Sequence, residues 1–468
     1  MSTEKESSRF KKPLGQWIKA IFWSLVYVLF IVWVGNFWWL LLLPLIVDAF
    51  LTHFVPWTWW KKTKNKSLLA FFGWVDAVVF ALVAVYFINT FLFQNYQIPS
   101  SSLEKSLMVG DFLFVSKASF GPRVPNTPLS FPLVQHTFPL LNCKSFIENP
   151  QWDYHRLKGF DSIERNDIVV FNFPAGDTVA TKVQNPDFYS SIHSYGRDAV
   201  VNNKAEYGDI IYRPVDRREN YVKRCVAIAG DWLTIKNNQV YVNDVAQKKI
   251  PGLQFNYFVQ TDGTRLTDDV LEKLNISVDD RMLLNIQENN DFTKLMALDA
   301  TLPIYHFPLT DESVAKLKQI KGVIAVKVEP ALDFIAGEVF PLGGHKNWNR
   351  DNYGPIWVPK KGAKLLLNKY NLPIYSRIIT NYERNKLEVK GDQIYINDKI
   401  ATTYQFKMDY FWMMGDNRHN SADSRYWGFV PEDHVVGRPV VVWLSLDKDK
   451  GWFSGKIRWN RFFKYAAE

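Results

Sequence analysis

Cysteine is scarce in this chain and histidine is sparse. Of the 468 residues, only Cys143 and Cys225 are cysteine, and eight are histidine. The two cysteines fit neither a zinc site nor a CxxC redox pair, and no HExxH or similar metal-ligand spacing occurs. Thiol redox chemistry and metal-dependent hydrolysis are therefore disfavoured. We expect two buried free thiols, the alternative being a Cys143–Cys225 disulfide if this part of the chain is exported.

A concentrated basic stripe is also missing. The formal net charge is +9, but the lysines and arginines are spread along the sequence. Nucleic-acid binding needs cations gathered on one face, so no nucleic-acid partner is expected. Attraction to anionic lipid explains the charge equally well. Half of the 18 tryptophans lie within residues 17–74, beside the N-terminal apolar runs, as indoles do at a membrane–water interface.

Charge is nearly absent from two long segments. Residues 20–47 have no charged side chain and would form ~42 Å of helix, more than the ~30 Å hydrocarbon core of a bilayer. They predict either one tilted span or a hairpin that breaks at Gly35–Asn36. Residues 68–93 contain one charge, Asp76, and predict a transmembrane helix.

The flanks of the second segment predict its orientation. Four lysines and no acid lie within residues 61–66, and the positive-inside rule places such a loop in the cytoplasm. The chain after residue 94 is then outside. A cleaved secretory signal does not fit, because the first apolar run is too long and a second one follows.

The remainder of the chain is predicted to be mainly β. Short runs of β-branched and aromatic residues, bounded by Gly, Asp, Asn and Pro, indicate strands at 111–117, 167–173, 221–230 and 439–446. Helical patterns are few, the best being 267–274 and 309–320. Segments 233–246 and 387–401 share Leu, Lys, Gln, Tyr, Asn and Asp in register, and each predicts a β-hairpin with a polar turn.

These patterns predict N-terminal transmembrane helices followed by a mainly-β exported domain with a large inserted subdomain. The predicted divisions are a membrane anchor with a basic loop over 1–66, a transmembrane helix over 67–94, a main β domain over 95–246 and 387–446, an insertion over 247–386, and a basic-aromatic tail over 447–468.

The stretch QIPSSSLEKSL, residues 97–107, places three serines just outside the predicted bilayer. Such a cluster is often only a flexible linker. A serine nucleophile needs a base, and the one histidine in a motif-like setting, His419, is expected to be a surface residue. Lysine is the remaining choice, because serine–lysine pairs are a known variant of nucleophilic catalysis.

Lys223 lies within an apolar strand pattern, YVKRCVAIAGD, which is unusual for a residue seldom buried. One interpretation is that Lys223 and Arg224 simply alternate across a half-exposed strand. The functional interpretation is that burial lowers the lysine pKa from about 10.4, so that the neutral amine can accept a proton.

These stretches together resemble bacterial signal peptidase I. The matching boxes are IPSSSL, VGDFLFVSK, RNDIVVFNFP, YVKRCVAIAGD and MMGDNRHNSADSRYWGFVPEDHVVGR, in the family's order and after a transmembrane span. The resemblance implies a membrane-anchored serine–lysine protease that removes signal peptides from exported proteins. Leu103 stands where the family usually has Met, and Ser101 where it usually has Gly, but neither change removes a reacting group.

The resemblance also implies the roles of individual residues. Ser102 matches the nucleophile and Lys223 its general base. The supporting residues it implies are Ser100, which with the Ser102 backbone N–H holds the oxyanion, Ser421, which orients the lysine, and Asp423 with Arg425, which fix the catalytic loop. The substrate pockets it implies are a P1 pocket shaped by Ile98, Leu103, Leu107, Tyr221 and Val222, and a P3 pocket to which Tyr96 and Leu113 contribute.

The implied substrate is a preprotein bound as an extended strand at a sheet edge, with small residues of an A-x-A pattern in the pockets. The implied reaction passes through an acyl-enzyme and uses no metal and no cofactor. Partners implied are signal-peptide-bearing preproteins, membrane lipid and the protein-export translocon. The implied location is the cytoplasmic (inner) membrane, multi-pass, with the catalytic domain on the outer, periplasmic side.

Three other functions are compatible with parts of the sequence. They are an inactive protease-like binding module, a serine–lysine enzyme that cuts only itself or one client, and a β-rich adhesion protein. Alanine at Ser102 or Lys223 would leave an adhesion function intact. The tail segment 456–465 fits an interfacial membrane contact as well as a solvated basic tail that packs its aromatic residues on the core.

Overall fold

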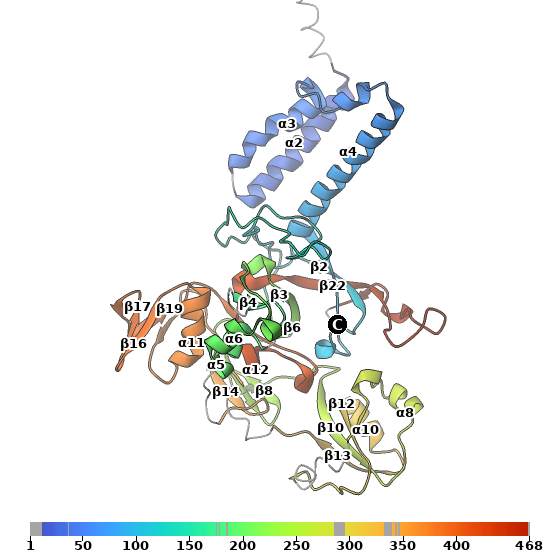
Figure 1. The fold of residues 1–468 in the computed structure, drawn as a ribbon, viewed down its shortest axis with the longest axis vertical. Coiled ribbons are helices and arrows are strands. Elements are labelled where there is room, and N and C mark those ends of the chain that lie inside the picture. Colours follow the sequence, from blue (N-terminus) through green and yellow to red (C-terminus); the bar gives the residue numbers. More distant parts are fainter. Residues whose placement is uncertain are drawn as a thin grey trace, which may run out of the picture.

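The computed structural model describes residues 12–35, 37–174, 176, 178–183, 186–284, 295–331, 339–341, 344 and 347–466. Apolar helices stand together at one end of the molecule, and the β-rich part forms the other end (Figure 1). The two ends meet where α4 (Lys66–Phe87) and its π turn run into β1 (Phe93–Gln97). The short connection fixes the height of the serine cluster relative to the helices.

The first apolar run folds back on itself. Helix α2 (Leu14–Val34) ends at Gly35, whose φ of +73° is a left-handed conformation that glycine adopts without strain. The chain returns beside α2 through α3 (Leu43–Val47), and the Tyr27 hydroxyl donates to the Trp39 carbonyl. Of the two alternatives for residues 20–47, the structure therefore has the hairpin.

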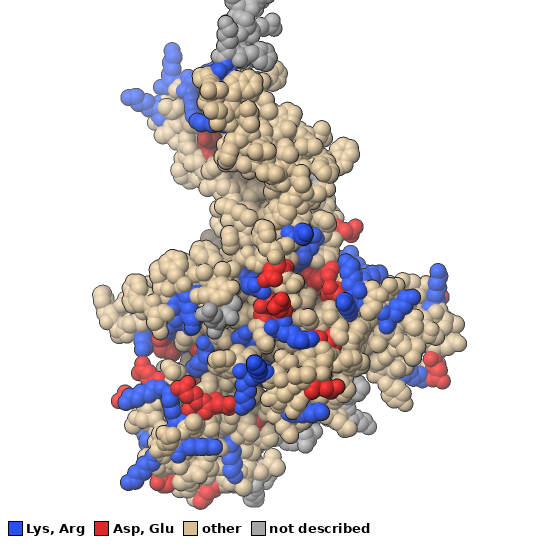
Figure 2. Space-filling model, turned by 180° about the vertical axis from the view of Figure 1, so that it is seen from behind, with Lys and Arg blue, Asp and Glu red and all other residues tan. Residues whose placement is uncertain are grey.

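Helix α4 (Lys66–Phe87) continues in a π-helical turn, Ile88–Leu92, and β1 (Phe93–Gln97) follows at once. Within the described residues, two helices are long and apolar enough to cross a membrane: α2, and α4 with its π turn, with mean hydropathies of 2.0 and 2.4. Figure 2 shows few charged side chains along the helical part, apart from lysines and arginines gathered at its far end. The predicted basic loop, residues 61–66, precedes α4 at this end.

The largest sheet holds the serine cluster and Lys223. Its strand order is β1-β2-β22-β3-β6-β20-β21, and β23 also pairs with β22. Four of its strands confirm the predicted ones: β2 (Asp111–Ser116), β3 (Ile168–Asn172), β6 (Asn220–Ala227) and β22 (Val435–Ser445). The others are β1, β20 (Tyr410–Met414), β21 (Val430–Pro431) and β23 (Lys464–Tyr465). Because β1 is at the end of this order, one of its edges is unpaired within the sheet.

Both predicted hairpins are present, and each continues into a short third strand. The first is β7 (Trp232–Lys236), β8 (Gln239–Val242) and β9 (Val245–Ala246), and the second is β16 (Leu387–Lys390), β17 (Gln393–Ile396) and β18 (Lys399–Ile400). Asn-Asp pairs turn β8 into β9 and β17 into β18, with positive φ at both residues. Asn and Asp tolerate that conformation better than most residues, so the polar turns fix the register.

The segment predicted as an insertion, 247–386, contains two kinds of structure. Its first part forms a separate sheet in the order β11-β12-β10-β13, covered by the two predicted helices α8 (Asp268–Lys273) and α10 (Asp311–Leu317). The strands are β10 (Gln254–Thr261), β11 (Met282–Leu283), β12 (Ile304–Thr310) and β13 (Val323–Val328). Residues 285–294, 332–338, 342–343 and 345–346 of the predicted insertion lie outside the described residues.

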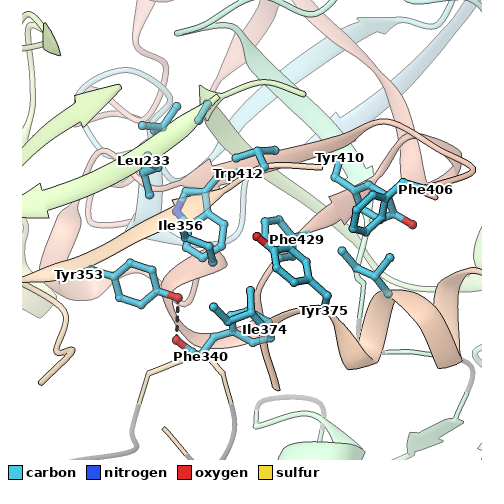
Figure 3. Packing of buried hydrophobic residues seen from close by; sticks show 14 of the residues in the cluster. Leu233, Phe340, Tyr353, Ile356, Ile374, Tyr375, Phe406, Tyr410, Trp412 and Phe429 are labelled. Carbon is cyan, nitrogen blue, oxygen red and sulfur yellow. Dashed lines mark hydrogen bonds between the residues drawn. The ribbon is translucent and has the colours of Figure 1, made fainter. Parts of the chain in front are cut away.

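Its second part belongs to the main core. Strand β14 (Tyr353–Trp357) pairs with β7, and α11 (Leu372–Arg377) packs into the same apolar cluster. Figure 3 shows Tyr353, Ile374 and Tyr375 close to Trp412 and Phe429. The segment from about 353 on is therefore not separate from the main β body, because its apolar residues complete that body's core.

Smaller elements join these sheets. They are the pairs β4 (Thr178–Ala180) with β5 (Ile210–Tyr212) and β15 (Lys364–Leu366) with β19 (Thr403–Gln405), the helices α5 (Phe188–Tyr195), α6 (Arg197–Asn202) and α7 (Lys204–Tyr207), and α12 (Ser424–Trp427). The C-terminal tail is partly fixed, because Arg461 is buried in an ion pair with Asp111, while Trp459 and Phe463 are exposed.

Candidate functional site

Ser102 and Lys223 are in direct contact. Ser102 lies in a short 3-10 turn, Ser101–Leu103, and Lys223 lies in the middle of β6. The Lys223 Nζ donates to the Ser102 Oγ at 2.6 Å, and the exposed fractions of the two residues are only 4% and 6%. The structure thus brings together the two residues that the sequence analysis assigned to the chemistry.

Burial prepares Lys223 to act as a base. Removal from water lowers the pKa of Lys223 from 10.5 to about 8, although the negative charges of Asp423 and Asp416 oppose this shift. A pKa of about 8 leaves roughly one amine in ten neutral at pH 7, against about one in 2,500 at the reference value. The neutral amine can then take the Ser102 proton across the 2.6 Å contact.

A network not predicted from the sequence holds Ser102 against β6. Asp416 accepts two hydrogen bonds from Arg224, at 2.8 and 2.7 Å, and a third from Ser106 at 2.6 Å. The Asn417 backbone N–H donates to the Ser102 carbonyl at 3.1 Å. Since Arg224 is the neighbour of Lys223 in β6, these bonds connect the strand of the lysine to the turn of the serine. The only signal in the sequence was the position of Asp416 and Asn417 inside a matching box.

Gly415 packs very closely against Ser421 and the Ser102 backbone. A Cβ on this residue would lie 2.3 Å from the Ser421 Oγ and 2.6 Å from the Ser102 carbonyl oxygen. Real Cβ atoms do not approach backbone atoms so closely, so a side chain here would displace the Ser102 turn. The position requires glycine for space, a constraint that a single sequence does not reveal.

Gly415→Ala is therefore expected to displace the Ser102 turn. If Ser102 is the nucleophile that the sequence resemblance implies, this change should lower kcat/KM on a soluble Ala-x-Ala peptide about 100-fold, because a displacement near 1 Å at a reacting group has this order of effect. Gly15→Ala is the matched control, since nothing lies within 4 Å of its added Cβ. Equal rates for Gly415→Ala and the wild type would show that the turn does not need this close approach.

The supporting residues differ in how the structure places them. Asp423 and Arg425 are buried and form a two-point ion pair, with Arg425 Nε and Nη2 at 2.9 and 2.8 Å from the carboxylate. Ser421 is buried beside Gly415, but its Oγ has no hydrogen-bond partner among the described residues, so the expected bond to Lys223 is not formed. Ser100 is exposed, two residues before Ser102. The roles of Ser421 and Ser100 stay predictions.

Most of the predicted pocket residues share one apolar cluster. Four of them are buried together with residues of β2, β3 and β22, and two more pack against this cluster from its side. The buried four are Ile98, Leu103, Leu107 and Leu113, and the partly buried two are Tyr96 and Val222. Tyr221 is placed elsewhere: it packs against another cluster and stacks on Phe173 at 4.6 Å. Neighbouring residues of a strand face opposite sides, which separates Tyr221 from Val222.

The prediction that His419 is a surface residue was wrong. Its side chain is fully buried, its Nδ1 accepts from the Asn256 backbone N–H at 3.3 Å, and its Nε2 lies 3.3 Å from an Asp351 carboxylate oxygen. The residue therefore connects the 415–421 loop to the start of β10 and does not contact Ser102. Its burial comes from a segment distant in the sequence, which composition does not reveal.

The two cysteines are both free, so the alternative of a disulfide is excluded. Cys225 is buried, as expected, but Cys143 is exposed. The expectation of two buried thiols was therefore wrong for Cys143, which lies in the irregular segment between β2 and β3.

Comparison with known proteins matches the chain to a family of peptidases. The family described as signal peptidase, peptidase S26, matches residues 71–292 and 361–444, which include Ser102, Lys223 and the 415–425 loop. The chain belongs to this signal peptidase family. Peptide-bond hydrolysis is therefore its established class of activity.

Proteins similar to this chain, from several bacteria, are named signal peptidase I. The protein from Buchnera aphidicola subsp. Acyrthosiphon pisum is 23% identical over 410 residues, which cover 86% of this chain and 83% of the relative. The one from Haemophilus influenzae is 22% identical over 403 residues, covering 86% and 78%. The one from Aquifex aeolicus is 41% identical over 51 residues, covering 11% of this chain and 20% of the relative. The resemblance to bacterial signal peptidase I is thus confirmed.

Proposed function

We propose that this chain removes N-terminal signal peptides from exported preproteins, with Ser102 as nucleophile and Lys223 as general base. The observation that carries the proposal is the 2.6 Å contact between Lys223 Nζ and Ser102 Oγ in a buried setting that lowers the lysine pKa to about 8. A lysine that is merely close to a serine in the sequence would not support this mechanism. A general base must reach the serine hydroxyl and must also be able to lose its own proton near neutral pH.

In the proposed reaction, neutral Lys223 removes the Ser102 proton as Oγ attacks the scissile carbonyl carbon. The protonated lysine then gives this proton to the departing amine of the mature protein, and the signal peptide remains as an acyl ester on Ser102. Lys223, neutral again, activates the water that hydrolyses the ester. The Ser102 backbone N–H and the Ser100 hydroxyl are the proposed donors to the oxyanion.

The proposed substrate geometry follows from β1. This strand has an unpaired edge in the main sheet and leads directly into the Ser101–Leu103 turn. An extended preprotein segment can add to this edge by main-chain hydrogen bonds while its small side chains face the cluster around Ile98 and Leu103. Bulky apolar residues on the enzyme favour small side chains on the substrate, as in an A-x-A site.

The proposed location is the outer face of the cytoplasmic membrane. Helices α2 and α4 have the length and apolar character of spans, and the lysines before α4 favour the cytoplasmic side by the positive-inside rule. Ser102 lies ten residues beyond Leu92, where the second span ends. A signal peptide threaded through the membrane by the export translocon would present its cleavage site at this height.

The test is cleavage of a purified precursor with an Ala-x-Ala site by the full-length protein in liposomes, with the new N-terminus identified by mass spectrometry. Cleavage is expected directly after the second alanine. A matched precursor with isoleucine at that alanine should react roughly 100-fold more slowly or worse, because the pocket must expand for each added carbon. Equal cleavage of both precursors, or cleavage at unrelated positions, would contradict the proposed specificity.

A further inference from the structure

A cavity of about 360 Å³ lies where the helical end meets the β part of the molecule. Its wall includes Tyr86, Asn89 and Thr90 from the end of α4 and its π turn, and the β1 residues that follow. The loop after β2 forms another wall, and the Tyr86 hydroxyl donates to the Pro128 carbonyl in this loop. The cavity therefore opens at the level at which the proposed membrane span ends.

Positive charge is in excess in this cavity. Lys117, Arg123 and Arg217 line it, and Asp216 is the one acidic residue among its lining side chains. The two arginines have fixed acceptors: Arg123 bonds to Asn172 and to the Asp433 carbonyl, and Arg217 bonds to Thr127.

Lys117 differs from the two arginines. Its Nζ has no hydrogen bond and no ion pair with any residue in the described part of the chain, while one oxygen of Asp216 is occupied by Thr127. Burial, followed by the charges of Arg123 and Arg217, lowers the pKa of Lys117 from 10.5 to about 7, against the opposing effect of Asp216. An anion in the cavity would supply the acceptor and the negative charge that this amine lacks.

The loop that lines the cavity carries exposed apolar residues. Phe131 and Leu133 line the cavity with exposed fractions of 43% and 73%, and Leu140 and Leu141 farther along the same segment are 95% and 73% exposed. Such a set of exposed apolar residues marks an interaction surface. A soluble anion would use only the charged floor of the cavity, whereas a phospholipid would use both its floor and this apolar loop.

We infer that this cavity binds the phosphate of a membrane phospholipid headgroup, with Lys117 as its direct donor and the acyl chains running along the apolar loop. The inference rests on the proposed membrane anchoring of the chain. Arg123 and Arg217 contribute charge, but their hydrogen bonds to protein acceptors hold them in place. The bound lipid would lie beside the end of α4 and beside β1, which forms one wall of the cavity. It would thus help to fix the height of the serine turn at the membrane.

The first test counts phosphatidylglycerol molecules retained by the delipidated full-length protein in detergent, using native mass spectrometry. Lys117→Met should weaken retention roughly tenfold, the effect of one charge-assisted hydrogen bond, and Lys117→Arg should restore part of it. Lys158→Met is the matched control, because it removes an exposed lysine that does not line the cavity. Equal retention by Lys117→Met and Lys158→Met would overturn the inference.

The second test uses the wild-type protein and so does not depend on the folding of a variant. Acetylation of Lys117 at pH 7.5, followed by peptide mapping, should be slowed at least fivefold by phosphatidylglycerol added to the detergent micelles and not by inorganic phosphate at equal concentration. Protection by inorganic phosphate alone would overturn the lipid assignment in favour of a free anion. Protection only by an Ala-x-Ala peptide would overturn it in favour of a substrate subsite.

The same measurement on Ser102→Ala separates the two proposals. This variant should be inactive if the proposed function holds, yet Lys117 should still be protected by lipid. Loss of cleavage with unchanged protection supports both proposals, whereas protection that is absent from a protein that cleaves normally overturns the lipid site alone.

Discussion

Lys223→Met is expected to reduce kcat/KM on an Ala-x-Ala peptide by at least ~10³-fold, because Lys223 is the only titratable group hydrogen-bonded to the Ser102 Oγ within the described residues. In the wild type, kcat/KM should rise about tenfold per pH unit below pH 8 and level off above it, as the pKa of about 8 requires for a base that acts in its neutral form. Lys223→Arg should be as inactive as Lys223→Met, since a guanidinium keeps its proton. A rate profile without this rise, or activity in either variant, would exclude Lys223 as the base.

The same substitution should stabilise the fold. A folded-state pKa lowered from 10.5 to about 8 means that the unfolded chain binds the proton more tightly, so folding costs about 3 kcal/mol at pH 7. This penalty is fully present below pH 8 and is lost as the pH rises through and beyond 10.5, because the unfolded chain then also gives up the proton. The Tm of Lys223→Met in detergent should exceed that of the wild type at pH 7, with a smaller difference at pH 10. Lys399→Met, at an exposed position in β18, should change neither Tm nor rate.

Local patterns predicted the strands and hairpins well because short-range chemistry fixes them. The alternation of apolar residues defines β2, β3, β6 and β22, and polar turns at residues 237–238 and 391–392 define the two hairpins. Ser102 and Lys223 were recognisable for a related reason: each stands inside a stretch whose residue types match the same family. Their 2.6 Å contact confirms that the two stretches meet.

Features that depend on packing between distant segments were missed. His419 is buried because β10 and Asp351 cover it, and Gly415 is needed because Ser421 and the Ser102 carbonyl lie against it. The pairing of β14 with β7 also joins residues more than a hundred positions apart. A periodic pattern shows that a segment has an apolar face, but it does not show which other segment will cover that face.

Removing one partner of the buried ion pair of Asp423 and Arg425 is expected to destabilise the fold strongly. Burial raises the pKa of Asp423, but the Arg425 charge and its hydrogen bonds, with a further bond from the Gly415 N–H, hold this pKa below its usual value. Asp423→Ala would leave Arg425, which is 1% exposed, as an unpaired buried charge. We expect a loss of about 3–5 kcal/mol in the free energy of unfolding, measured by urea titration in detergent. The pair Lys204 and Asp209 is exposed on both sides, so Asp209→Ala should cost less than about 1 kcal/mol.

Two further readouts distinguish an electrostatic role of Asp423 from general damage to the fold. The double variant Asp423→Ala/Arg425→Met should recover much of the lost stability, because it no longer buries an unpaired charge. Asp423 also raises the pKa of Lys223, so Asp423→Asn should lower this pKa further. The rising limb of the pH–rate profile should then move to lower pH in the fraction of enzyme that remains folded. An unmoved limb would mean that Asp423 fixes the loop without tuning the base, and its coupling to Lys223 would have to be abandoned.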